Sequence, residues 1–155
     1  MPAFELQERA PQPALAIRLR SPVSEIPAAL ASALPEAWHA AQAAGLSASG
    51  PPYTRYFSLG DPADEVDYEA GVPLPGPAAE GPGRAQPVEL PGGTVAVGWH
   101  VGPYETLAET YEALLRWIGE QGRAVGGPMW EVYWTDPQES PDPSTWRTEV
   151  IVPVS

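Results

Sequence analysis

The clearest candidate for chemistry is one carboxylate inside an apolar run near the end of the chain. Residues 147–154 read Arg-Thr-Glu-Val-Ile-Val-Pro-Val, a β-branched composition that is typical of a strand. Side chains alternate along a strand, so Glu149 shares a face with Ile151 and points away from Val150. If this face is buried, the glutamate either keeps its proton or binds a cation. The alternative is a solvated charge at the edge of a sheet.

A tyrosine on the preceding run is the second candidate. The run at 129–134 is rich in aromatic residues and predicts the other arm of a closing hairpin, with Tyr133 near Glu149. In an enzyme, Glu149 would then act as general base on water while Tyr133 or a tryptophan orients an electrophilic ring. Tyr133 is equally compatible with a core role, and alternation puts Trp130 and Trp134 on the face opposite to it.

Four further aromatic residues are candidates for ligand binding. Aromatic rings attract delocalised cations through their faces, with about 0.5–2 kcal/mol per good contact. A pocket of rings around Glu149 would therefore select ligands by charge and flatness. Each ring is also compatible with a place in the core. The four candidates are Tyr56, Tyr68, Trp99 and Trp38.

Composition excludes several classes of site. The chain has 155 residues and a net charge of −12. It contains no cysteine, and this excludes disulfides, zinc-thiolate sites and thiol nucleophiles. The acidity argues against direct contact with nucleic acid, and either attracts cationic ligands or only aids solubility. His39 and His100 lie far apart, so we expect no metal site and no cofactor, with haem a remote alternative. We expect His100 to fix the turn at Gly102-Pro103.

No apolar run reaches the length of a signal core or a membrane span. We therefore expect a cytoplasmic protein with no membrane partner.

Two helices and at least seven strands are predicted. A helix at 26–44 would begin after Ser24 as N-cap and end at Gly45, and Pro35 predicts either a kink or a break in it near Leu34. A second helix at 104–121 carries an apolar stripe and ends at Gly122. The predicted strands are 4–8, 14–20, 53–59, 65–74, 94–101 and the two arms of the closing hairpin. Gly60-Asp61-Pro62 predicts a hairpin turn.

An internal repeat organises these elements. Gly45 corresponds to Gly122 and Tyr56 to Tyr133 at one constant offset, and Glu69 then matches Glu149 beyond a longer turn. Each half reads strand, helix, strand, strand. We therefore expect one α+β domain over residues 1–155, with a first half at about 4–74, a Pro- and Gly-rich linker at about 75–90, and a second half at about 91–155.

A set of short motifs follows in order along the chain. They are Pro52-Tyr53-Thr54-Arg55-Tyr56, Asp67-Tyr68-Glu69-Ala70-Gly71-Val72-Pro73, His100-Val101-Gly102-Pro103-Tyr104, Glu131-Val132-Tyr133 and Arg147-Thr148-Glu149-Val150. Together they resemble the gyrase-inhibitor-like (GyrI-like) effector-binding domain. The resemblance implies a duplicated βαββ fold with an antiparallel sheet, two main helices and a central ligand cleft. It also implies that one buried glutamate, here Glu149, stands among aromatic residues in that cleft.

Three functions follow as expectations. The first is a free-standing module that binds hydrophobic, planar or cationic aromatic compounds, as in multidrug binding. The second is a hydrolase that opens the strained ring of cyclopropane-bearing DNA-alkylating toxins in the same cleft, with Glu149 and Tyr133 as its catalytic pair. The third is a protein that modulates gyrase or serves a transcription regulator as partner.

Overall fold

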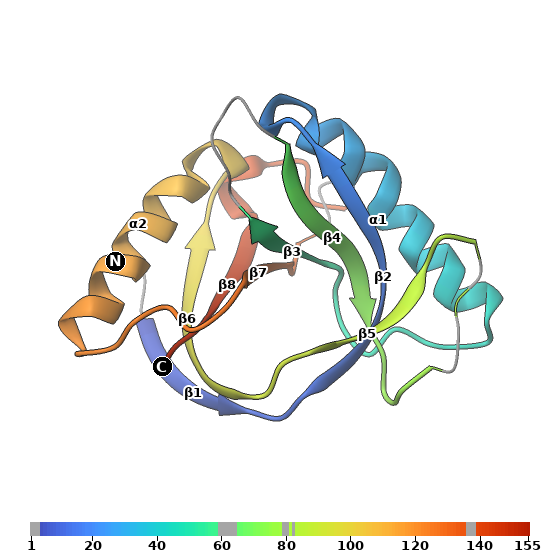
Figure 1. Ribbon diagram of the computed structural model, residues 1–155. Coiled ribbons are helices and arrows are strands. Elements are labelled where there is room, and N and C mark those ends of the chain that lie inside the picture. Colours follow the sequence, from blue (N-terminus) through green and yellow to red (C-terminus); the bar gives the residue numbers. More distant parts are fainter. Residues whose placement is uncertain (1–3, 59–64, 79–80, 82, 136–138) are drawn as a thin grey trace. The chain divides into compact units, whose positions relative to one another are not determined.

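The computed structural model describes residues 4–58, 65–78, 81, 83–135 and 139–155 (Figure 1). The chain divides into two compact units. One unit comprises Ala10–Gly92, and the other comprises Met1–Arg9 together with Gly93–Ser155. We refer to them as the Glu69 unit and the Glu149 unit, after the glutamate that each contains.

The Glu69 unit is a four-stranded antiparallel sheet with one helix against it. Its strands are β2 (Gln12–Ser21), β3 (Tyr53–Ser58), β4 (Val66–Pro73) and β5 (Gln86–Leu90), in the order β3-β4-β2-β5. Helix α1 (Ile26–Ala43) follows the 3₁₀ turn η1 (Val23–Glu25) and packs on β2 and β4. The core between sheet and helix comprises Leu15, Ile17, Ala37, Ala41, Val72, Leu74 and Ala85.

The Glu149 unit repeats this arrangement. Its strands are β1 (Phe4–Arg9), β6 (Gly93–Val101), β7 (Met129–Tyr133) and β8 (Arg147–Pro153), in the order β1-β6-β8-β7. Helix α2 (Leu107–Glu120) follows the 3₁₀ turn η2 (Tyr104–Thr106), and a third such turn, η3 (Pro143–Thr145), precedes β8. The core under α2 comprises Ala96, Leu114, Ile118, Val150 and Val152.

The predicted α+β class and the duplicated βαββ unit are confirmed, as β2-α1-β3-β4 and β6-α2-β7-β8. The fourth strand of each sheet comes from outside its own repeat. β1 immediately precedes β2 in the chain but pairs with β6, and β5 precedes β6 but pairs with β2. The segment expected as a linker therefore contains strand β5 at Gln86–Leu90.

Strand register puts the two glutamates at equivalent positions. Glu69 lies opposite Arg18 on β2 and Arg55 on β3. Glu149 lies opposite Trp99 on β6 and Val132 on β7. The two repeats thus place a carboxylate at the same point of the middle strand, next to different neighbours.

Local predictions at the helix ends had mixed outcomes. Gly45 and Gly122 have φ values of 74° and 73°, so both helices end with the predicted left-handed glycine. Of the two outcomes predicted at Pro35, a kink or a break, the break is wrong, because α1 continues through this residue. Ser24 is not the N-cap, because η1 occupies Val23–Glu25 and no side chain caps α1. The predicted turn at Gly60-Asp61-Pro62 lies outside the described residues.

Candidate functional site

The two faces of the sheet in the Glu149 unit carry different side chains. Val150 and Val152 pack under α2, so Glu149 and Ile151 point to the opposite face. Residues directly opposite each other in neighbouring strands share a face. The register therefore adds Trp99 from β6 and Trp130 from β7. We call this surface, with Trp134 just beyond β7, the Glu149 face.

Glu149 is a buried ion-pair partner. Only 6% of the residue is exposed. Its Oε2 accepts a hydrogen bond of 2.8 Å from Nη2 of Arg9 at the end of β1. Its Oε1 accepts a hydrogen bond of 3.2 Å from the indole nitrogen of Trp134. Both carboxylate oxygens thus have donors from the same unit, which compensates the cost of burying the charge.

Two tryptophans and a second arginine accompany this carboxylate. The rings of Trp99 and Trp134 lie 5.9 Å apart at an interplanar angle of 49°. The guanidinium carbon of Arg147 is 4.7 Å from the centre of the Trp99 ring, within the range of a cation–π contact. Trp130 is 4% exposed, whereas Trp134 is 52% exposed. Trp134 therefore offers both a polar donor to Glu149 and an accessible ring.

The predicted pairing of Tyr133 with Glu149 is wrong. Tyr133 lies opposite Thr148, so its side chain is on the α2 face, away from Glu149. Its ring is 5.8 Å from that of Tyr104, which in turn is 5.0 Å from that of Trp146. Neighbouring arms of a hairpin bring side chains together only where the two positions pair, and Glu149 pairs with Val132. A catalytic pair of Glu149 and Tyr133 is therefore not assembled.

Tyr56 and Tyr68 also lie away from the glutamate of their unit. They are paired across β3 and β4 on the α1 face, with ring centres 6.2 Å apart. Tyr68 is fully buried, and its hydroxyl shares a hydrogen bond of 2.7 Å with Ser21 Oγ. The strand register that separates Tyr133 from Glu149 thus also separates its counterpart Tyr56 from Glu69, and alternation within β4 separates Tyr68 from Glu69.

The tyrosine beside Glu69 is one that sequence reasoning missed. The hydroxyl of Tyr53 donates a 3.2 Å hydrogen bond to Glu69 Oε1, and both residues are buried. Burial raises the pKa of the Glu69 carboxyl, against the opposing effects of Arg55 and of this hydrogen bond. Burial, followed by the nearby Glu69 charge, also raises the pKa of the Tyr53 hydroxyl. Tyr53 and Arg55 are two residues apart on β3, so their side chains lie on the same face, and Arg55 pairs with Glu69. This alternation is the signal in the sequence that could have identified Tyr53.

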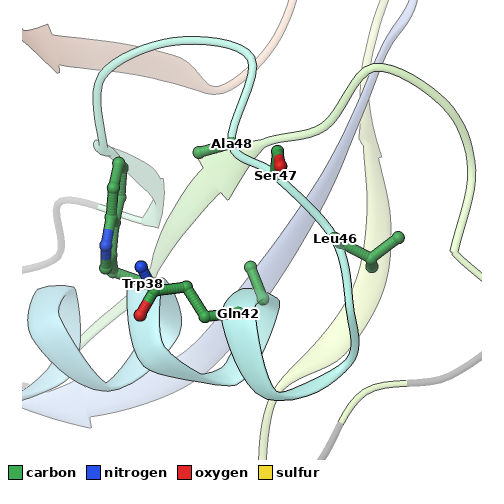
Figure 2. A pocket seen from close by; sticks show the side chains of 6 residues that line it. Trp38, Gln42, Leu46, Ser47 and Ala48 are labelled. Atoms are coloured by element: carbon green, nitrogen blue, oxygen red, sulfur yellow. The ribbon is translucent and has the colours of Figure 1, made fainter.

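Trp38 lines a small pocket within the Glu69 unit. Figure 2 shows its ring at one side of this pocket, between α1 and the segment that follows the helix. The cavity volume is about 170 Å³, and the lining residues are Trp38, Ala41, Gln42, Leu46, Ser47 and Ala48. An engineered protein cavity of roughly 150 Å³ holds one benzene ring, so this pocket has the volume for a single ring.

His100 fixes the turn before α2, as predicted. Its Nε2 lies 2.9 Å from the carbonyl oxygen of Pro103, and its Nδ1 lies 2.7 Å from Thr110 Oγ1. A carbonyl only accepts, so Nε2 donates, and in the neutral ring Nδ1 accepts from the threonine hydroxyl. His100 is 6% exposed and sits on the face opposite Glu149.

Comparison with known proteins places the fold in a family. The model for the GyrI-like small molecule binding domain matches residues 2–155. The chain belongs to the GyrI-like family. This confirms the resemblance drawn from the ordered motifs, and it makes binding of a small molecule the general role of the domain. A search of curated proteins found no match.

Solved structures share the GyrI-like fold at low sequence identity. The C-terminal domain of EcmrR is 21% identical, with a TM-score of 0.86 over 100% of this chain and 98% of that one. A hydrolase from Listeria innocua is 16% identical, with a TM-score of 0.68 over 98% and 91% of the two chains. SAV2435 bound to tetraphenylphosphonium is 16% identical, with a TM-score of 0.65 over 99% and 94%. In an EcmrR–DNA complex, the chain covers only 57% of the EcmrR chain.

Among the described residues, no helix combines the length and apolar character needed to cross a membrane. The same residues contain no group of three or more His, Asp or Glu placed to hold a metal ion.

Proposed function

We propose that this GyrI-like domain binds hydrophobic, planar or cationic aromatic compounds on the Glu149 face. The observation that carries the proposal is a carboxylate, 6% exposed, hydrogen-bonded to Trp134 and opposite Trp99 in the sheet. A flat ring can stack on the accessible indole of Trp134. The carboxylate and the ring faces also attract a delocalised cation. The complex of SAV2435 with tetraphenylphosphonium supports this ligand class, since the two chains share a fold.

The test is a titration with a panel of flat neutral and cationic aromatic compounds. Binding is measured by tryptophan fluorescence and by calorimetry, in the wild type and in Glu149→Gln. We expect the affinity of cations to fall at least about tenfold in this variant, because Arg9 then stands without its counter-charge beside the ligand. Glu120→Gln is the matched control, because it removes the same charge from an exposed position at the end of α2. Equal affinities in all three proteins would refute the proposed site.

A hydrolase acting on strained-ring electrophiles is the second candidate. A buried carboxylate can serve as general base, and the Listeria innocua hydrolase shares the fold. Against it, both oxygens of Glu149 already accept hydrogen bonds, and Tyr133 lies on the other face. Incubation with a cyclopropane-bearing alkylator followed by mass spectrometry distinguishes the two functions. A water adduct that depends on Glu149 supports hydrolysis, and unaltered compound that still binds supports the binding role.

We propose no direct contact with nucleic acid. The net charge of −12 opposes binding to phosphate, although the EcmrR structure with DNA shows that a protein with this fold in part of its chain forms such a complex. A gel-shift assay at low salt tests this proposal. A shifted band that disappears at high salt would contradict it.

A further inference from the structure

Arg9 is held in place by more than its contact with Glu149. Its Nε and Nη2 donate hydrogen bonds of 3.0 and 2.8 Å to the side-chain oxygen of Gln7, two residues earlier on β1. Nη2 also donates to Glu149 at 2.8 Å. A planar guanidinium can serve two acceptors in this way because its donors form a rigid fork. Gln7 therefore orients the cation toward the carboxylate.

A second arginine engages the aromatic part of the same face. Arg147 places its guanidinium carbon 4.7 Å from the centre of the Trp99 ring. Trp99 is the direct neighbour of Glu149 across β6 and β8. The two groups that would attract a lipophilic cation, a carboxylate and an indole face, thus each have an arginine of the chain as partner.

We propose that Arg9 makes the Glu149 face select flat neutral aromatic compounds over lipophilic cations. This inference rests on the proposed function and decides between its two ligand classes. The carboxylate of Glu149 and the guanidinium of Arg9 sum to zero charge, so a cation near them gains little net attraction. A neutral ring stacks on Trp134 while the ion pair stays intact.

Binding of a cation at the carboxylate requires that Arg9 leave it. Arginine stays protonated at any ordinary pH, so the guanidinium must move to water with its charge. A ligand such as tetraphenylphosphonium has no hydrogen-bond donor with which to replace the lost contact at Glu149 Oε2. Arg9 therefore competes with cationic ligands for the same oxygen, and its removal should favour them.

The test compares a cation with a neutral compound of similar rings. Dissociation constants of tetraphenylphosphonium and triphenylphosphine oxide are measured by calorimetry for the wild type and for Arg9→Met, which keeps an unbranched side chain without the charge. We expect the phosphonium to bind at least about tenfold more tightly to Arg9→Met, and the oxide to change by less than about twofold. Arg123→Met removes one exposed arginine and controls for the overall charge. Its affinities should equal those of the wild type.

Two further variants keep the outcome decisive. Arg9→Gln also removes the charge and retains an amide donor, so it replaces Arg9→Met if circular dichroism shows that the latter is unfolded. In the background of Glu149→Gln, Arg9→Met brings the local charge back to zero, so phosphonium affinity should return to about the wild-type value and should not reach that of Arg9→Met alone. Unchanged or weaker phosphonium binding in both Arg9 variants, or an equal gain in Arg123→Met, overturns the inference while leaving the proposed function intact. If neither probe binds the wild type or an Arg9 variant, the proposed function falls, and the inference falls with it.

Discussion

At the scale of single residues, the duplication gives two glutamates with different chemistry. Glu69 has a tyrosine hydroxyl as its donor and Arg18 and Arg55 across the strands, whereas Glu149 has an ion pair with Arg9 and an indole donor. For Glu69, desolvation outweighs the neighbouring cation, and the pKa of its carboxyl is raised above the ordinary value of 4.5. The position in the sheet is inherited from the repeat, but the charge state depends on the neighbours.

The raised pKa of Glu69 predicts a pH-dependent stability. The folded state binds this proton more tightly than the unfolded state, so the contribution is fully present below the unfolded pKa and is lost as pH rises through the folded pKa. Glu69→Gln cannot lose a proton. Its free energy of unfolding relative to the wild type should therefore increase from about pH 4 to about pH 7, as measured by urea denaturation. Glu120→Gln, at an exposed position on α2, should show no such trend. If the free energy of unfolding of Glu69→Gln differs from that of the wild type by the same amount at both pH values, the raised pKa of Glu69 is contradicted.

A close contact beside Tyr53 provides a second residue-scale prediction. A Cβ atom at Gly71 would lie 2.8 Å from the Tyr53 ring and 2.8 Å from the carbonyl oxygen of Leu15. Gly71→Ala should therefore lower the free energy of unfolding by about 1–3 kcal/mol, because backbone on one side prevents relaxation. Gly119→Ala is the control, since a Cβ there meets no atom within 4 Å, and in helix α2 it should stabilise by about 1 kcal/mol. Equal effects at the two positions would refute the steric argument.

At the scale of elements, periodicity predicted most of the fold. The alternation in β2 and β6 and the apolar stripe of α2 identify strands and helices because burial of one face imposes these repeats. Alternation alone predicts that Glu149 and Val150 point to opposite faces of the sheet. Pairing partners did not follow, because register depends on turns and on contacts far apart in sequence. The sequence alone therefore predicts Tyr133 beside Glu149 and indicates neither Arg9 nor Tyr53 as a neighbour of a glutamate.

Helix α1 shows how packing can override a local signal. Pro35 lacks the N–H that would bond the carbonyl of Ala31, yet the helix continues, with Ala33, Ala37 and Ala41 buried against the sheet. The burial of this alanine face offsets the local cost. Short side chains also allow the helix to lie close to the strands.

Pro35→Ala should consequently stabilise the protein. Alanine restores the missing hydrogen bond, and proline in a helix interior is about 3 kcal/mol less favourable than alanine. Greater freedom of the unfolded chain subtracts about 0.4–1 kcal/mol from this gain. We therefore expect an increase of about 2 kcal/mol in the free energy of unfolding, measured by urea denaturation. Pro27→Ala, in the first turn of the same helix, should bring no comparable gain, and a loss of stability at position 35 would show that the ring itself packs usefully.

At the scale of the whole molecule, the acidic surface and the Glu149 face act on ligands over different ranges. The net charge of −12 extends over the protein and attracts cations through solvent, up to about a Debye length. Arg9 acts only at contact with Glu149, where its charge cancels that of the carboxylate. Long-range attraction and local rejection of a cation can therefore coexist. The net charge of the protein raises the association rate of the cation, whereas Arg9 raises its dissociation rate.

Stopped-flow fluorescence at several salt concentrations separates these contributions. The association rate of tetraphenylphosphonium should fall severalfold between about 20 mM and about 500 mM salt, because screening removes the attraction. That of triphenylphosphine oxide, which carries no charge, should stay constant. Arg9→Met should leave the salt dependence almost unchanged, since the net charge moves only from −12 to −13, and should mainly slow dissociation of the cation. If the association rate of the cation does not respond to salt, the acidity of the chain does not steer ligands, and its contribution is limited to solubility.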